Sequence, residues 1–399
     1  RNEELEPWIQ WVTAHTGKTL AEHRVYRLGD IVNHDIPQIW EQLESFGLTV
    51  GAISPMNAKY RMSRPAFFVP DPWTQTEVVA PPPLKRLYRA IVQAVNDNAQ
   101  ARITPGSALA LLVGLLTYGR RANYHRYLQW AATSVSRPWR RSMVLDLLLA
   151  DVFIDRVKHT RPDFASLFLN AGAHIQHHYM FNAAPYRGPS RNPAWYVRPD
   201  ADPVLDVYRA YDTILTQIQR EFPQARIMIA TGLHQTPHGE VTYYWRLRDH
   251  AEFLKKIGVR FRRALPRMSR DFVVEFDTAE DAAAGELRLR NARALNGVPL
   301  FEVDNRGTSL FVMLTFPQEI GDDFCFRIGS ETFTDLRKDV VFVALKNGKH
   351  DGIGYFIDLD VPRGGLPEEF PLAALPQRVM SAFGLRASDE APRRQVVFT

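Results

Sequence analysis

The sequence predicts an α/β fold, and in particular a three-layer αβα sandwich, because short apolar runs alternate with amphipathic helical patterns. Three such runs, at 48–53, 164–170 and 226–230, are bounded by turn residues and have the length of buried strands. Helical periodicity precedes the first run at 36–46 and separates the other two at 203–221. We therefore expect the three runs to be neighbouring strands of one central sheet.

The composition is that of a folded chain with room for more than one ordinary domain. Of 399 residues, 45% are hydrophobic and 23% are charged, which supports a large core. The net charge of +5 comes from 49 basic and 44 acidic residues, an excess that suits an anionic substrate but is too weak to predict binding to a nucleic-acid polymer. The single cysteine, Cys325, excludes an intrachain disulfide and a cysteine-based zinc site. No apolar run reaches the length of a membrane span, so we expect a cytoplasmic protein.

The first 150 residues are expected to hold the start of the core and an insertion. Residues 1–64 contain the first helix and strand and form the first part of the α/β core. Residues 65–150 are expected to be a proline connector and a mostly helical insertion, because six prolines lie in 65–83 and periodic apolar runs follow. Residues 84–150 either cap an active site at the carboxyl edge of the sheet or belong to its helical layer.

The remaining residues are expected to complete the core around a second insertion. Residues 151–240 carry two of the expected strands and form the centre of the core. The alternation in 241–340 predicts a small α+β insertion. Residues 341–399 supply a closing strand and helix, and the polar tail after Ala387 is expected to be mobile.

Histidines lie at glycine-rich breaks next to the expected strands 164–170 and 226–230 and next to the closing strand. An asparagine begins the break after 164–170. The residues that share this position are Asn170, His174, His177, His178, His234 and His350. In open α/β sheets, ligands bind beyond the carboxyl ends of the strands. Imidazole is a common metal ligand and a general base near neutral pH. The alternative is a polar loop whose histidines only hydrogen-bond the backbone.

Taken in order, these pieces resemble the alkaline phosphatase superfamily, most closely its type I phosphodiesterase and nucleotide pyrophosphatase branch. The stretch Asn170-Ala171-Gly172-Ala173-His174 resembles the metal-binding Asp-x-x-Gly-His motif of that branch. The run RIMIATGLHQ resembles the strand that ends in Ser-Asp-His-Gly, and His350 resembles the last metal histidine. The resemblance covers about two thirds of the chain and depends on the order of the motifs more than on any one of them.

This resemblance implies a metal-dependent hydrolase or transferase acting on a phosphoric ester, phosphodiester or pyrophosphate. It implies a divalent metal, most simply one zinc ion, and an anionic small-molecule or glycan-linked phosphoester as the substrate. The implied metal ligands are His174, His350, Asn170 and His234. His177 and His178 are the implied substrate-binding residues, and no catalytic residue is implied.

The chain departs from the family pattern at the carboxylates and the nucleophile. Asn170 stands where the branch has Asp, which removes a negative charge and should lower metal affinity. The expected nucleophile falls near Pro7, and the nearest hydroxyls are Thr13 and Thr16. These departures favour an alternative function, in which a metal-poor, catalytically degenerate member binds a ligand or partner. A sulfatase is disfavoured, because Cys325 does not lie in the C/S-x-P-x-R sequence that such an enzyme needs.

Overall fold

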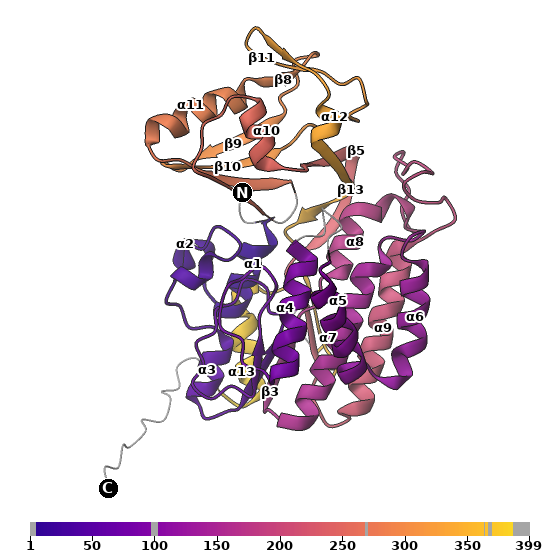
Figure 1. The fold of residues 1–399 in the computed structure, drawn as a ribbon. Coiled ribbons are helices and arrows are strands. Elements are labelled where there is room, and N and C mark those ends of the chain that lie inside the picture. The colour runs from indigo at the N-terminus through magenta and orange to yellow at the C-terminus, as the bar shows by residue number, and fades with distance from the viewer. Residues whose placement is uncertain (1–4, 97–102, 268–269, 363, 366–368, 386–399) are drawn as a thin grey trace.

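The structure is a computed structural model that describes residues 5–96, 103–267, 270–362, 364–365 and 369–385. Helices and strands combine into an α/β fold, as the sequence predicts, with two parts that we call the body and the lobe (Figure 1). The body comprises the described residues of 5–244 and 341–385, and the lobe those of 245–340. The tail expected after Ala387 lies outside the described residues, and the domain boundaries expected from the sequence stay predictions.

The body is built on a small parallel sheet in the order β2-β1-β3. Its strands are β1 (Val50–Ile53), β2 (Phe67–Val69) and β3 (Phe164–Leu167). Gly51 lies opposite Phe67 on one side and Ala165 on the other. All four residues of β1 are buried, as expected for a strand with neighbours on both sides and helices on both faces. The prediction that the first two apolar runs are neighbouring strands is therefore confirmed.

The third apolar run forms a strand, but the prediction that it neighbours the other two is wrong. It becomes β4 (Met228–Thr231), which pairs antiparallel with β14 (Tyr355–Asp358) in a separate two-stranded sheet. Among the described residues no hydrogen-bonded ladder joins β3 to β4, so they do not form one central sheet. The physical reason is a cavity between the two strands, described below.

A layer of helices covers one face of the sheet and shares a single hydrophobic core with it. The layer consists of α4 (Pro82–Asn96), α5 (Pro105–Tyr118), α6 (Tyr124–Thr133), α7 (Arg140–Thr160), α8 (Ala171–Tyr179) and α9 (Pro203–Glu221). Local chemistry sets the helix starts: Thr104 caps α5 by accepting from Ser107 N, and Asp202 caps α9 by accepting from Leu205 N. The helices of the expected insertion thus pack onto the sheet, next to the helices of the core.

Helices on the other face of β1 enclose a second hydrophobic cluster. Trp40 of α3 (Ile39–Ser45) and Met380 of α13 (Leu375–Ala382) pack there with Val50 and Ala52. The same side of the body holds α1 (Pro7–Thr16) and α2 (Leu20–His23). Short 3-10 turns lie at Asp30–Asn33, Arg121–Asn123, Met180–Asn182 and Leu372–Ala374.

The lobe has its own sheets, helices and core. One sheet has the order β6-β7-β10-β9 and the other the order β12-β11-β8, both antiparallel. The strands are β6 (Arg263–Pro266), β7 (Asp271–Glu275), β8 (Ala292–Ala294), β9 (Phe301–Asn305), β10 (Ser309–Leu314), β11 (Phe326–Ile328) and β12 (Glu331–Phe333). The helices are α10 (His250–Lys256), α11 (Ala279–Arg290) and α12 (Leu336–Asp339). Buried residues of most of these elements form one cluster that runs from Trp245 to Val340, and Ala264 of β6 and Phe333 of β12 pack against it partly buried.

A long pair of antiparallel strands joins the lobe to the body (Figure 1). Its strands are β5 (His234–Leu247) and β13 (Val340–Asp351), with irregular register at Phe342/Ala344 and Lys346/Gly348. The lobe end of β13 lies in the lobe core, and its other end packs against α8.

Helix α5 carries an apolar face that points to solvent. Leu109, Leu112, Val113 and Leu116 are 61%, 53%, 48% and 63% exposed, at the spacing of one helix face. In the described part of the chain, no helix combines the length and the apolar character that crossing a membrane requires.

Candidate functional site

The candidate site begins at the amino end of α8, which buried polar groups hold in place. The carboxylate of Asp146, on α7, accepts hydrogen bonds from Asn170 N at 3.3 Å and from Ala171 N at 2.8 Å. The hydroxyl of Tyr211, on α9, donates to Asp146 at 2.8 Å and accepts from Gly172 N at 2.7 Å. A side chain at Gly172 would come within 2.9 Å of the Tyr211 ring, so glycine permits this close approach. Burial raises the pKa of Asp146 to about 6.

The sequence after β3 therefore forms a helix that begins directly at the expected glycine-rich break. His174, His177 and His178 lie three and four positions apart, which places them on adjacent parts of one helix face. The ring centroids of His174 and His178 are 4.9 Å apart, and those of His177 and His178 are 6.1 Å apart. The strand end thus delivers a cluster of imidazoles on a rigid element.

His350 joins this cluster from β13, although it lies 173 positions from His177 in the sequence. The two Nε2 atoms are 2.8 Å apart, and the ring centroids are 4.5 Å apart. Helix α8 can approach β13 so closely because a Cβ at Gly348 would lie 2.8 Å from Gln176 O. The structure thus brings His350 to His177, whereas the sequence analysis paired it with His174.

The hydrogen bonds of both rings turn their Nε2 lone pairs toward each other. His177 Nδ1 lies 3.2 Å from Gly348 O, so it carries the proton and donates to that carbonyl. Burial lowers the pKa of His350, and a backbone hydrogen bond with Leu5 offsets part of that shift, which is the effect of a ring N–H that donates to a carbonyl. Because Nε2 of His350 faces His177, we assign that bond to Nδ1. Two facing lone pairs repel unless a proton or a cation lies between them.

The histidines of the cluster are neutral near pH 7. Burial is the main cause, and it lowers the pKa of His177 to about 3 and that of His350 to about 4. Burial also lowers the pKa of His178 well below its ordinary value, and neighbouring His174 and His177 add to this effect. His174 is accessible to a cavity that protein surrounds, so desolvation lowers its pKa as well. Neutral imidazole is the form that binds a metal ion.

The other sequence-predicted ligands lie close by but contact different partners. His234, on β5, lies opposite Asp351 of β13, and its Nδ1 is 2.6 Å from Ile353 O. Its ring packs against Tyr355, with centroids 5.7 Å apart. Asn170 occupies the cap position of α8, but its side chain makes no capping hydrogen bond. His178 donates from Nδ1 to Leu345 O at 3.0 Å.

Basic side chains near the cluster give the site a positive character. Lys346 lowers the pKa of both His177 and His350, secondary to burial in each case. The guanidinium of Arg270 lies over the Tyr244 ring, 4.2 Å from its centroid. Burial lowers the pKa of Lys346, with a further contribution from the charge of Arg270. This pair of cations suits an anionic ligand.

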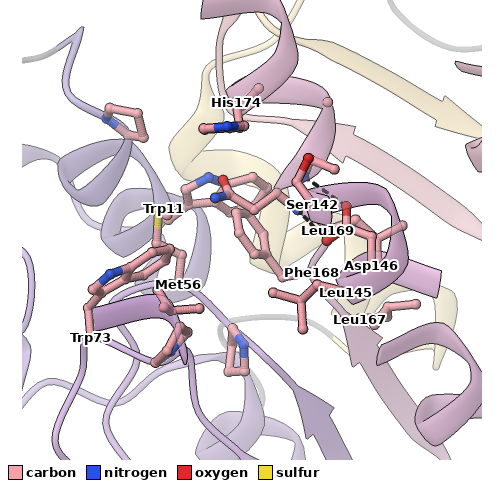
Figure 2. A pocket seen from close by; sticks show the side chains of 18 of the residues that line it. Trp11, Met56, Trp73, Ser142, Leu145, Asp146, Leu167, Phe168, Leu169 and His174 are labelled. Atoms are coloured by element: carbon pink, nitrogen blue, oxygen red, sulfur yellow. Dashed lines mark hydrogen bonds between the residues drawn. The ribbon is translucent and has the colours of Figure 1, made fainter. Parts of the chain in front are cut away.

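A cavity of 3710 Å³, which we call the central cavity, opens beside the histidines. Segments of β3, β4, α1, α7, α9 and α13 line it. In Figure 2, Trp11 and Trp73 lie on one side, Leu145 and Leu167 on the other, and His174 lies at one end. The ring of Trp11 meets that of Phe168 edge-on at 5.0 Å.

The hydroxyls proposed as nucleophiles are engaged elsewhere. Thr13 Oγ1 lies 3.2 Å from His23 Nε2, and Thr16 Oγ1 donates to Val12 O at 2.7 Å. Both side chains are buried within α1. Asp146 was not predicted from the sequence; its signal is a carboxylate within the apolar run of α7, a position that it shares with Asp151.

The donor chemistry at His177 and His350 fits one edge of a metal site, but a complete ligand set is not assembled. In the described ranges, no three His, Cys, Asp or Glu side chains form a group able to hold a metal ion. Comparison of the chain with protein-family models, with curated proteins and with solved structures found no match. The resemblance seen in the sequence therefore stays an expectation.

Proposed function

We propose that the protein is a metal-dependent hydrolase that acts on a phosphoric ester and binds one divalent ion between His177 and His350. The observation that carries this proposal is the pair of neutral imidazoles whose Nε2 atoms face each other at 2.8 Å. Each ring is oriented by a hydrogen bond to the backbone. Ring N–H groups that donate to carbonyls are the usual second partners of metal-binding histidines.

The donor set suits zinc better than magnesium or calcium, because it offers nitrogen. Two imidazole nitrogens on one tetrahedral zinc lie about 3.3 Å apart, from bond lengths of about 2.0–2.1 Å. The observed separation of 2.8 Å would have to widen by about 0.5 Å, which a small rotation of either ring supplies. Motif-matched His174 remains a further candidate ligand, because its ring centroid lies 4.9 Å from that of His178. Asn170 caps the opposite end of α8, about 10 Å along the helix from His177, so it does not reach this ion.

When bound, the ion would polarise a phosphoryl oxygen and so stabilise charge that develops there. The chain itself would bind the anionic group through Lys346 and Arg270, both close to the histidine cluster. The carbonyls of Gly348 and Leu5 would keep both rings oriented with Nε2 toward the ion. The walls of the central cavity would exclude part of the solvent from His174.

Calorimetric titration with zinc tests the binding step. We expect one ion per chain in the parent protein, and at least about 100-fold weaker binding in His177→Ala and in His350→Ala. Asn170→Asp should tighten binding only slightly, because the added negative charge lies about 10 Å from His177, at the amino end of α8. His159→Ala is the matched control, since His159 is an exposed histidine on α7. If neither the parent nor Asn170→Asp binds zinc while circular dichroism shows an intact fold, the metal site is ruled out.

Turnover is tested separately with bis(4-nitrophenyl) phosphate as a diester and 4-nitrophenyl phosphate as a monoester. We expect chelator-sensitive hydrolysis that disappears in both alanine variants and persists in His159→Ala. Zinc binding with no hydrolysis of either ester would favour the second candidate function, a ligand-binding protein without turnover. The specific observations behind that candidate are Asn170 in place of a carboxylate and the engaged hydroxyls of Thr13 and Thr16.

A further inference from the structure

Strand β3 has one open edge. Phe164 N donates to Thr49 O at 3.1 Å and Phe168 N to Ile53 O at 3.0 Å, so alternate residues of β3 face β1. The backbone groups of Ala165 and Leu167 therefore face the opposite way. No described strand pairs with that edge.

Strand β4 has an open edge as well. Leu359 N donates to Ile227 O at 3.0 Å, and Ile357 lies opposite Ile229, so the odd-numbered residues of β4 face β14. The backbone groups of Met228 and Ala230 face away from β14, and again no strand in the described ranges pairs with them. Both open edges line the central cavity.

Helices cover the space between these edges on both faces. Leu145 of α7 and Ile214 of α9 line the cavity from one helical layer, and Val379 of α13 lines it from the other. The apolar side chains of β3 and β4 are only half-buried, although β1 beside them is fully buried. The gap is therefore a position inside the sheet and not a surface groove.

Helix α1 spans the carboxyl ends of both strands. Its Trp11 packs on Phe168, just after β3, and a Cβ at Gly232, just after β4, would lie 3.8 Å from the same tryptophan. The amino end of α1 lies beside His350, through Leu5. A strand that ran parallel to β3 through the gap would emerge at this amino end.

We propose that the gap between β3 and β4 is a binding site for one β-strand, joined to the amino end of α1 and parallel to β3. About five residues would suffice, the usual length of such strands. The strand is apolar on both faces, because helices flank it on both. Its backbone pairs with Ala165 and Leu167 on one side and with Met228 and Ala230 on the other. It would convert the β2-β1-β3 and β4-β14 sheets into one sheet.

Two features favour a peptide strand over a small molecule. The open edges present alternating N–H and C=O groups, which a strand satisfies in full. Helices also cover the gap on both faces, as they do for a strand inside a sheet. This inference does not depend on the metal site, because its residues lie along the strands and not among the histidines.

Hydrogen exchange on the 399-residue chain provides the first test. We expect the amides of Ala165, Leu167, Met228 and Ala230 to exchange at least about tenfold faster than the paired amide of Ser166. The second test extends the chain before Arg1 by about five alternating valines and isoleucines, the length of a typical strand. Exchange at the four amides should then slow at least about tenfold, and Tm should rise by several degrees. A central proline in the same extension is the control, and it should produce neither change.

Three results would overturn the proposal. Slow exchange at Ala165 and Leu167 in the unextended chain would show that the edge of β3 is already paired. Equal protection by the valine and proline extensions would show that the effect does not require a paired strand. Protection by the same peptide only when it is added as a separate molecule would refute the connection to α1 and assign the site to another chain.

Discussion

The lobe and the body contain the same kinds of elements but differ in how completely their strands are packed. In the lobe, Leu310, Val312 and Leu314 of β10 are at most 1% exposed, because β7 and β9 flank that strand. In the body, no residue of β3 or β4 is fully buried. The difference comes from the cavity beside β3 and β4, because the edge strand β2, which borders no such gap in its sheet, is fully buried with only β1 as a neighbouring strand among the described residues.

The largest expected effect comes from matched truncations in the two regions. Leu310→Ala should destabilise the lobe by about 3–5 kcal/mol, because it leaves a void in a closed core. Leu167→Ala in β3 should cost only about 1 kcal/mol, because that side chain already borders the central cavity. Native-state hydrogen exchange can measure both parts of the chain separately. Equal losses at both positions would mean that β3 is packed as tightly as β10.

The second largest effect is expected on acidification, which should destabilise the body more than the lobe. The pKa of His177 is lowered to about 3 and that of His350 to about 4. The contribution of these two histidines to the free energy of unfolding is therefore fully present above the ordinary pKa of 6.5. It is lost as the pH falls from 6.5 toward these values, since the unfolded chain then binds more protons. Each histidine should add a slope of about 1.4 kcal/mol per pH unit in that window.

The body should therefore lose its exchange protection before the lobe, which buries only His250 in this way. The double variant His177→Gln, His350→Gln should lower the slope of the body and leave that of the lobe unchanged. A slope remains in the body, because the pKa values of His15, His23, His174 and His178 are lowered as well. A body slope that is the same in parent and variant would show that His177 and His350 do not titrate on unfolding.

Asp146 should make the free energy of unfolding fall as the pH rises, which is a smaller change than that from the histidines and opposite in sign. The pKa of Asp146 is raised from 3.8 to about 6. Its contribution to the free energy of unfolding is therefore present below pH 3.8 and is lost as the pH rises to 6. The loss should reach about 3 kcal/mol at most. Asp146→Asn should remove this decline, and denaturant unfolding at pH 4 and pH 6 measures it. Tyr211→Phe is the control, because it removes a hydrogen bond but keeps the titrating carboxyl.

The smallest effect on stability is expected on α5. Leu116→Gln should change the free energy of unfolding by less than about 0.5 kcal/mol, because the side chain is 63% exposed. Light scattering at high protein concentration should nevertheless show less self-association, because the apolar face of α5 is interrupted. The buried Leu147 on α7 is the contrasting position, where the same substitution should unfold the body.

Periodicity predicts the separate elements well but not the way in which they meet. The strands at Val50–Ile53 and Phe164–Leu167 and the helix at Pro203–Glu221 follow from local apolar patterns. The pairing of β4 with β14 does not, because an apolar run shows that a strand is buried and leaves its neighbour undefined. The apolar patterns of β3 and β4 also do not show that one edge of each strand is left unpaired.

The site could be predicted only in part for a related reason. His174, His177 and His350 could be predicted as site residues, because they are histidines at the ends of expected strands. The contact between His177 and His350 depends on how closely α8 approaches β13, which Gly348 permits and which sequence spacing does not encode. Whether either histidine binds an ion stays a prediction.

The paired strands β5 and β13 connect the lobe directly to the histidine pair. A single strand runs from Val340, in the lobe core, to His350 and Asp351 beside α8, a span of about 30 Å at the usual rise per residue. One end of β13 is therefore held in the lobe core, and the other end carries His350, one imidazole of the facing pair. A molecule that tilted the lobe would shift His350 relative to His177, and it would then change the zinc affinity that we propose for this pair.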